Sequence, residues 1–246
     1  MELAAQKPGG LLSGLRTTER FLCSVIRGDE VDWPAASDDE FYEQLLDRAI
    51  ANGVDLLVCY LLREKPSWEN IPAATREQLE QRTRDAIAVD LARTSDLAAL
   101  NEALAREGQQ VLLLKGAALA RTHYPQPYLR ARVDTDLMIE PDRIRQVRAL
   151  LAGLDYDLVG WTYKSHQFNA TKEKYGGRVI RYDVHWRANN GSKYARVIGF
   201  EDALAESVPV PGIDGARTLG PVHSLMLACM HRAATLSTQR DRLVWL

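Results

Sequence analysis

The residues with the clearest chemical potential are three aspartates in two alternating stretches of the chain. Asp134 and Asp136 stand two positions apart in residues 133–139, where apolar and polar side chains alternate. A period of two is typical of a β-strand with one apolar face, so both carboxylates are expected to point the same way. Asp183 lies in a second such stretch, residues 179–186, opposite its apolar side chains. The pattern predicts three carboxylates on two strands of one sheet.

Three converging carboxylates would form a hard-oxygen site of the kind that magnesium prefers. Alternate residues of a strand lie about 6 to 7 Å apart along one face, which lets two of them converge on one or two cations. Two divalent ions about 3.5 to 4 Å apart can activate an attacking hydroxyl and stabilise a departing pyrophosphate. Asp134, Asp136 and Asp183 are therefore the candidate metal ligands and catalytic residues.

An Asp-x-Asp pair alone is a weak signal, because such pairs are common on solvent-exposed strand edges. The order of the neighbouring elements strengthens it. A short apolar strand over residues 111–114 ends in Lys115-Gly116, and Pro141 opens an amphipathic helix directly after the Asp-Thr-Asp strand. Asp183 follows on a third strand, after a hairpin through residues 174–177. This order favours a catalytic interpretation of the acids.

The flanking parts of the chain are expected to be helical. Residues 1–108 are rich in Leu, Ala, Glu, Arg and Gln, and residues 191–246 return to a helical pattern whose longest candidate is 219–235. We predict an αβ core over residues 109–190 between these two helical regions. The final apolar residues, 242–246, have no capping residue, so the C-terminal region is expected to be truncated in mid-helix.

Several segments together resemble one known family. They are Val-Leu-Leu-Leu-Lys-Gly-Ala-Ala-Leu at 111–119, Tyr124, Leu129-Arg130, Asp-Thr-Asp-Leu-Met-Ile at 134–139, Tyr-Asp-Val-His-Trp at 182–186, and the late His231 with Arg-Leu-Val-Trp-Leu at 242–246. The chain resembles the uncharacterised nucleotidyltransferases of the polymerase-β-like superfamily from about its second helix onward. The resemblance implies an α+β fold, with a small mixed β-sheet core and helical flanks. It also implies a nucleoside triphosphate and Mg²⁺, with Mn²⁺ as the alternative ion.

The chain departs from the wider superfamily after its first core strand. Members usually have Gly-Ser or Gly-Gly there, whereas Gly116 is followed by Ala117. The Lys-Gly-Ala sequence is similar to the narrower family, and phosphate would then be held by backbone N–H groups at the start of the next helix, with Lys115. The gap from Gly116 to Asp134 is also longer than the superfamily norm, and the family continues past Trp245-Leu246 with a further Asp-bearing helix.

Six residues are candidates for nucleotide binding: Lys115, Gly116, Ala117, Arg130, His185 and His231. Arg130 matches the family's arginine, and a guanidinium bonds two phosphate oxygens at once, although it could also only neutralise the neighbouring carboxylates. His185 could orient Asp183, contact the nucleotide or form a structural hydrogen bond within the sheet. His231 lies in an apolar helix, where a lone histidine is more often a core residue, and only the resemblance makes it a site residue.

Composition limits the partners and the location. The net charge is −2 and basic residues are spread along 246 residues, so a nucleic acid is not the expected partner and a small-molecule, sugar, peptide or protein acceptor is favoured. Cys23, Cys59 and Cys229 fit no disulfide or metal pattern and are interpreted as reduced, mostly buried thiols. The absence of a signal core and of a roughly 20-residue apolar run predicts a cytoplasmic protein without a membrane segment.

The resulting hypothesis is a magnesium-dependent enzyme that moves a nucleoside monophosphate from a triphosphate to a hydroxyl of an unknown acceptor. Asp134 and Asp136 would hold the metals and the triphosphate, and Asp183 would complete the site or act as general base. The first alternative is a non-catalytic nucleotide-binding or scaffolding protein that keeps the fold. The second is phosphoryl transfer, which related metal sites could support.

Overall fold

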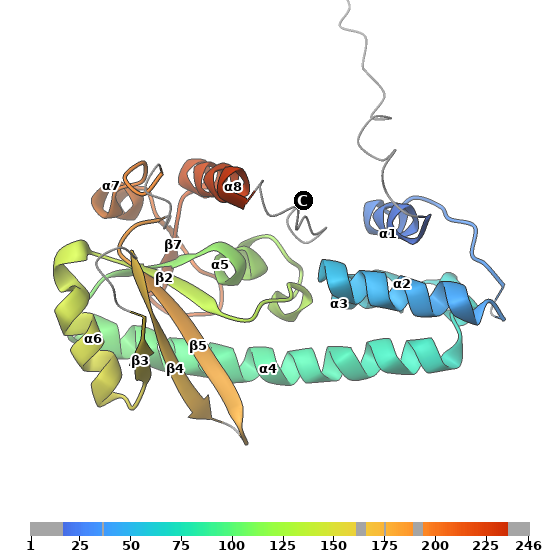
Figure 1. Ribbon diagram of the computed structural model, residues 1–246, viewed down its shortest axis with the longest axis horizontal. Coiled ribbons are helices and arrows are strands. Elements are labelled where there is room, and N and C mark those ends of the chain that lie inside the picture. The colour runs from blue at the N-terminus through green and yellow to red at the C-terminus, as the bar shows by residue number, and fades with distance from the viewer. Residues whose placement is uncertain (1–16, 36, 161–165, 175, 189–193, 236–246) are drawn as a thin grey trace, which may run out of the picture. The chain divides into compact units, whose positions relative to one another are not determined.

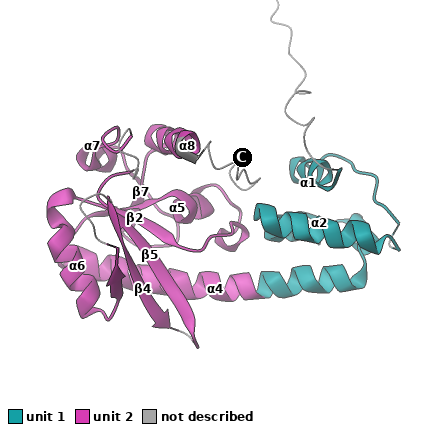
Figure 2. Ribbon diagram, viewed as in Figure 1, with its two compact units in different colours: residues 1–84, 242–246 teal, residues 85–241 magenta. Residues whose placement is uncertain are grey.

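The computed structural model describes residues 17–35, 37–160, 166–174, 176–188 and 194–235 (Figure 1). These residues divide into two compact units, with described residues up to Arg84 in unit 1 and those from Asp85 onward in unit 2 (Figure 2). The long helix α4 (Ala73–Arg106) begins in unit 1 and continues in unit 2. All the predicted site residues belong to unit 2.

Unit 1 is helical, as the sequence predicts for this part of the chain. Its elements before α4 are α1 (Thr17–Arg27), α2 (Asp39–Asn52), α3 (Asp55–Leu62) and the 3-10 helix η1 (Pro66–Asn70). Asp38 caps α2 by accepting a hydrogen bond from the Phe41 N–H, which satisfies one of the free donors of the first turn. The core includes the fully buried Leu22 and Tyr42, and the Tyr42 hydroxyl donates to backbone carbonyls.

Unit 2 contains a seven-stranded mixed sheet in the order β3-β4-β5-β2-β1-β7-β6. The strands are β1 (Val111–Leu114), β2 (Thr135–Ile139), β3 (Asp157–Val159), β4 (Gln167–Lys174), β5 (Arg178–His185), β6 (Val208–Pro209) and β7 (Arg217–Thr218). The helices are α5 (Lys115–Thr122), η2 (Pro127–Leu129), η3 (Pro141–Arg143), α6 (Ile144–Gly153), α7 (Phe200–Ala205) and α8 (Pro221–Thr235). The pairs β2–β5 and β1–β7 are parallel and the others antiparallel. The predicted α+β fold is confirmed.

Helices pack on both faces of this sheet (Figure 1). On one face, Leu113, Leu137 and Val184 share a buried core with Leu100 of α4 and Leu151 of α6. The core on the other face includes side chains of the sheet, of α7 and of α8: Leu112, Leu114, Met138, Phe200, Ala203, Leu227 and Met230. Because side chains alternate along a strand, Asp136 lies on the same face as Met138, toward α7 and α8.

A buried carboxylate ties α4 to the sheet on the opposite face. The Asp96 side chain is fully buried and accepts hydrogen bonds from the hydroxyls of Tyr156 (2.6 Å) and Tyr182 (2.7 Å). Lys174 at the end of β4 forms an ion pair with its other oxygen. Burial, followed by the charge of Asp96, raises the pKa of Tyr182, so the Tyr182 phenol stays protonated and donates to the carboxylate.

The C-terminal region differs from the all-helical pattern of its sequence. Strands β6 and β7 lie within it, and the Thr218 hydroxyl donates to the Leu113 carbonyl (2.7 Å). The final segment 242–246, and with it the expected truncation, lies outside the described residues. The three-part division of the chain stays a prediction. No helix among the described residues has both the length and the apolar character needed to cross a bilayer.

Candidate active site

Two neighbouring parallel strands bring the central acids together. In the register of β2 and β5, Asp136 lies opposite Asp183, and Met138 lies opposite His185. Along β5 the buried Ile180, Tyr182 and Val184 belong to the core shared with α4 and α6. Alternation therefore places Asp183 and His185 on the face that carries Asp136, as the sequence pattern predicts.

Asp136, Asp183 and His185 form a cluster in which each residue offers one ligand atom and these atoms lie within 4.8 Å of one another. Lys115 Nζ donates to Asp136 Oδ1 at 2.6 Å, and His185 Nε2 lies 2.8 Å from the same oxygen. His185 thus orients Asp136 rather than Asp183. Asn169 of β4, directly opposite Asp183 in the antiparallel register, donates its side-chain amide to Asp183 Oδ1.

Asp136 remains ionised although it is almost completely buried. Burial alone would raise the pKa of its carboxyl group, because a dry environment disfavours the charge. The hydrogen bond from His185 and the positive charge of Lys115 outweigh that effect, and the pKa lies below its ordinary value. The carboxylate is therefore available as an anionic ligand at neutral pH.

Asp134 lies one residue before β2, not within it. Burial and then the negative charges of Asp136 and Asp183 raise the pKa of Asp134 above its ordinary 3.8. The charge of Lys115 opposes this shift. The carboxylate of Asp134 is therefore repelled by those of Asp136 and Asp183, and a bound cation would reduce the repulsion among the three carboxylates.

In metal-free protein, replacing either aspartate of the Asp-Thr-Asp sequence by asparagine should change the melting temperature, and the two changes should have opposite signs. Asp134→Asn is expected to raise the melting temperature at pH 7, because the folded-state pKa of Asp134 is raised and its ionised form is disfavoured in the fold. This gain should fade as the pH falls through that raised pKa toward 3.8, where the folded carboxyl becomes protonated. Asp136→Asn is expected to lower the melting temperature at pH 7. That loss should shrink only as the pH falls through the depressed folded pKa of Asp136.

Thermal unfolding of both variants in EDTA between pH 3 and pH 8 measures this contrast. Asp157→Asn, at an exposed position of β3, is the matched control and should change little at any pH. Equal shifts for Asp134→Asn and Asp136→Asn would contradict the electrostatic description of the site.

Lys115 reaches Asp136 from an unusual backbone conformation. Its φ is +46°, in the left-handed region that costs an ordinary residue about 1 to 2 kcal/mol and that glycine adopts freely. Lys115, Gly116 and Ala117 form the first turn of α5, whose free N–H groups make a partial positive charge. The turn from β1 into α5 thus presents an ammonium group and backbone donors beside the acids.

Arg130 is a buried cation without an ion-pair partner among the described residues. It is 9% exposed, its guanidinium lies 5.9 Å from the centre of the Tyr124 ring, and its Nε has no hydrogen-bond partner. Burial lowers its pKa below the ordinary value. A buried guanidinium without a carboxylate partner favours an anionic ligand, because pairing with an anion would offset the cost of its desolvation.

His231 of α8 lies within electrostatic range of the same cluster. Burial and then the positive charge of Lys115 lower its pKa, while the charge of Asp136 opposes the shift. Helix α8 also contacts α5, the helix that begins at Lys115. The histidine singled out by resemblance is therefore near the acids and not in a remote core.

Comparison with protein families gives one match that covers most of the chain. Residues 38–246 match the family described as "Uncharacterised nucleotidyltransferase". The chain belongs to this family.

Comparison with curated proteins finds no match. Among solved structures, the chain is similar to the "Crystal structure of the complex between the Type VI effector Tas1 and its immunity protein", at 16% identity and a TM-score of 0.28, covering 67% of this chain and 96% of that chain. A TM-score this low supports no inference about the present protein.

In this member of the nucleotidyltransferase family, two features of the acid cluster have no signal in the sequence. Asn169 binds Asp183 only because the β4–β5 register places the two residues opposite each other. Lys115 is recognisable beside a glycine at a strand end, but its pairing with Asp136 depends on the antiparallel register that sets Leu114 opposite Asp136. Contacts between strands, not local patterns, determine both.

Proposed function

We propose that this chain transfers a nucleoside monophosphate from a nucleoside triphosphate to a hydroxyl of an acceptor, with pyrophosphate as the leaving group and Mg²⁺ as the required ion. The observation that carries the proposal is the Asp136–Asp183 pair, which parallel strands hold in one register with ligand atoms within 4.8 Å. Membership of the nucleotidyltransferase family supports the reaction class.

The donor set suits a hard divalent cation. Asp136 and Asp183 supply carboxylate oxygens, Asp134 adds a third negative charge beside them, and His185 fixes the orientation of Asp136. Mg²⁺ fits this set and Mn²⁺ is the alternative. A bound ion would lower the pKa of the acceptor hydroxyl and neutralise charge on the phosphates.

The other residues bind phosphate and direct the proton. Arg130 and the N–H groups at the start of α5, including those of Gly116 and Ala117, bind phosphate oxygens. Lys115 adds a positive charge beside them. Asp183 accepts the hydroxyl proton as general base, in an orientation fixed by Asn169. His231 contributes to the nucleotide side of the site.

The acceptor is proposed to be a small molecule, sugar, peptide or protein. A net charge of −2 favours such an acceptor over a nucleic acid, whose phosphates require a basic surface.

A cytoplasmic location is also proposed, because all three cysteines are free. Only Cys59 is buried, while Cys23 is intermediate and Cys229 exposed, so the expectation of mostly buried thiols is wrong.

Two measurements test the function. Calorimetric titration with each of the four triphosphates, with and without MgCl₂, measures binding. Transfer of ³²P from α-labelled triphosphate to metabolite or protein fractions, together with pyrophosphate release, measures turnover, and Asp136→Asn serves as the inactive control. Magnesium-dependent binding without any transfer would favour the non-catalytic alternative. Release of nucleoside diphosphate would favour phosphoryl transfer.

A further inference from the structure

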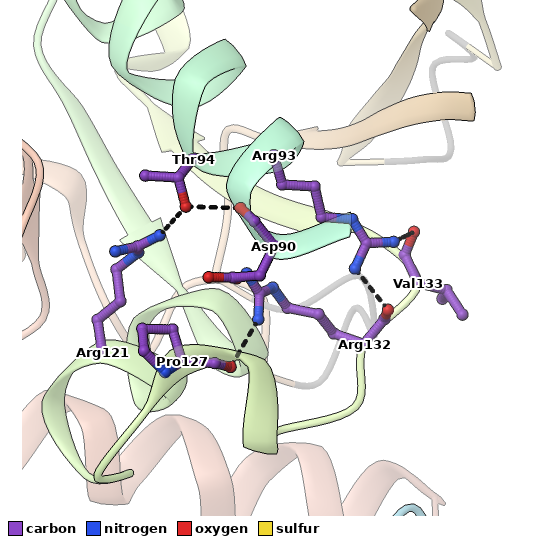
Figure 3. Close-up of polar contacts among 7 residues, drawn as sticks. All are labelled: Asp90, Arg93, Thr94, Arg121, Pro127, Arg132 and Val133. Atoms are coloured by element: carbon purple, nitrogen blue, oxygen red, sulfur yellow. Dashed lines mark hydrogen bonds and ion pairs between the residues drawn. The ribbon is translucent and has the colours of Figure 1, made fainter. Parts of the chain in front are cut away.

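Arg93 of α4 holds the backbone immediately before the Asp-Thr-Asp sequence. Its Nη1 donates to the carbonyl of Arg132 at 2.8 Å and its Nη2 to the carbonyl of Val133 at 3.2 Å (Figure 3). These are the two peptide carbonyls that precede Asp134. A guanidinium can span two adjacent acceptors because its donors form a rigid planar fork.

Asp90, one turn earlier on α4, holds the same segment through a side chain. It forms an ion pair with Arg132 Nη2 at 2.5 Å, and both side chains are largely buried. Arg132 Nη1 in turn donates to the Pro127 carbonyl at 3.1 Å (Figure 3). Asp90 and Arg93 together make a two-residue clamp on residues 132–133, here called the α4 clamp.

Asp134 needs such a support because the sheet does not provide one. The pairing of β2 with β5 begins at Thr135 opposite Tyr182, and the pairing with β1 ends at Asp136 opposite Leu114. Asp134 therefore precedes the first residue that either ladder fixes. Val133, directly before it, is 72% exposed and contributes little packing. Asp136 and Asp183, by contrast, are both held by ladder positions.

We propose that Arg93 and Asp90 are positioning residues that hold Asp134 at the proposed metal site, Arg93 through the backbone of residues 132–133 and Asp90 through the side chain of Arg132. The inference rests on the proposed function, in which Asp134 serves the bound cation. The competing view is that the α4 clamp only ties a loop to a helix. A purely structural tie would change thermal stability without changing metal affinity, whereas a positioning role changes metal affinity in particular.

The test uses the full chain with Arg93→Lys, which keeps the charge but cannot donate to both carbonyls in the same geometry. Mn²⁺ and Mg²⁺ affinities are measured by calorimetry. Amide hydrogen exchange of the peptides that cover residues 130–136 is measured without metal. Arg121→Lys is the matched control, because Arg121 makes its 2.5 Å bond to Thr94 of the same helix and not to the segment before Asp134.

We expect Arg93→Lys to weaken metal binding by about tenfold, because removing a group that orients a metal ligand typically costs at least that much affinity. Amide exchange at residues 130–136 should become faster, while the centre of β2 stays protected. Arg121→Lys should change neither. Faster exchange with unchanged metal affinity would overturn the positioning role, and unchanged exchange would overturn the α4 clamp itself. Wild-type protein that binds no metal would overturn the proposed function, and with it the role of Asp134, whatever the exchange shows. Should Arg93→Lys fail to fold, Asp90→Asn tests the same clamp with the same two readouts.

Discussion

Asp183→Asn is expected to lower nucleotidyl transfer by about a thousandfold or more and to abolish most of the stabilisation that magnesium gives. The substitution keeps the shape of the side chain, and its amide oxygen can still accept the hydrogen bond from Asn169. The fold should therefore survive without metal. In the proposed mechanism, the substitution removes one negative metal ligand and the base that accepts the hydroxyl proton, and both would act directly on the reacting groups.

Thermal unfolding with and without MgCl₂, and the ³²P transfer assay, measure the two parts of this prediction. A ligand that binds only the folded state raises the melting temperature, so the metal-dependent increase reports binding directly. Arg181→Gln alters an exposed residue two positions earlier on β5 and should leave both readouts close to wild type. Magnesium stabilisation that is the same in Asp183→Asn and wild-type protein would show that Asp183 is not a ligand.

The faces of the central strands could be predicted from the sequence because they depend on local alternation. A period of two over residues 179–186 separates Asp183 and His185 from Tyr182 and Val184 whatever the strand pairs with. The residue at which strand pairing begins cannot be predicted from local alternation. The ladder starts at Thr135 because its partner is Tyr182, far away in the chain, so alternation alone could not show that Asp134 stands outside β2.

The residues that support the site could not be predicted from the sequence for the same reason. Arg93 and Asp90 belong to a helix whose sequence gives no hint that two of its side chains hold a segment about 40 positions later. Strands β6 and β7 have two residues each, which is too short for any period to be visible. Local patterns therefore indicate the fold, whereas the residues that contact and orient the proposed site residues are set by pairing between distant parts of the chain.

The sequence also gives no sign of the contacts of Asp96, and these contacts lead to the stability prediction with the largest expected effect. Lys174→Met is expected to destabilise the protein by about 3 kcal/mol, because it leaves a fully buried carboxylate without its cation. The partners of Asp96 come from 60, 78 and 86 positions away, which no helical pattern reveals. Lys172→Met is the matched control on the same face of β4. The carboxylate that pairs with Lys172, Asp155, is exposed, so this change should cost only about 1 kcal/mol.

A double variant separates the loss of the ion pair from the loss of packing. In an Asp96→Asn background the buried group is neutral, and its amide oxygen can still accept from the hydroxyls of Tyr156 and Tyr182. Lys174→Met should then cost only about 1 kcal/mol, so the two substitutions should differ from additivity by about 2 kcal/mol. Urea unfolding of the four proteins at pH 7 measures this difference. Additive free energies would show that Lys174 stabilises the sheet through its aliphatic chain and not through the charge of Asp96, because only an electrostatic contribution depends on the identity of residue 96.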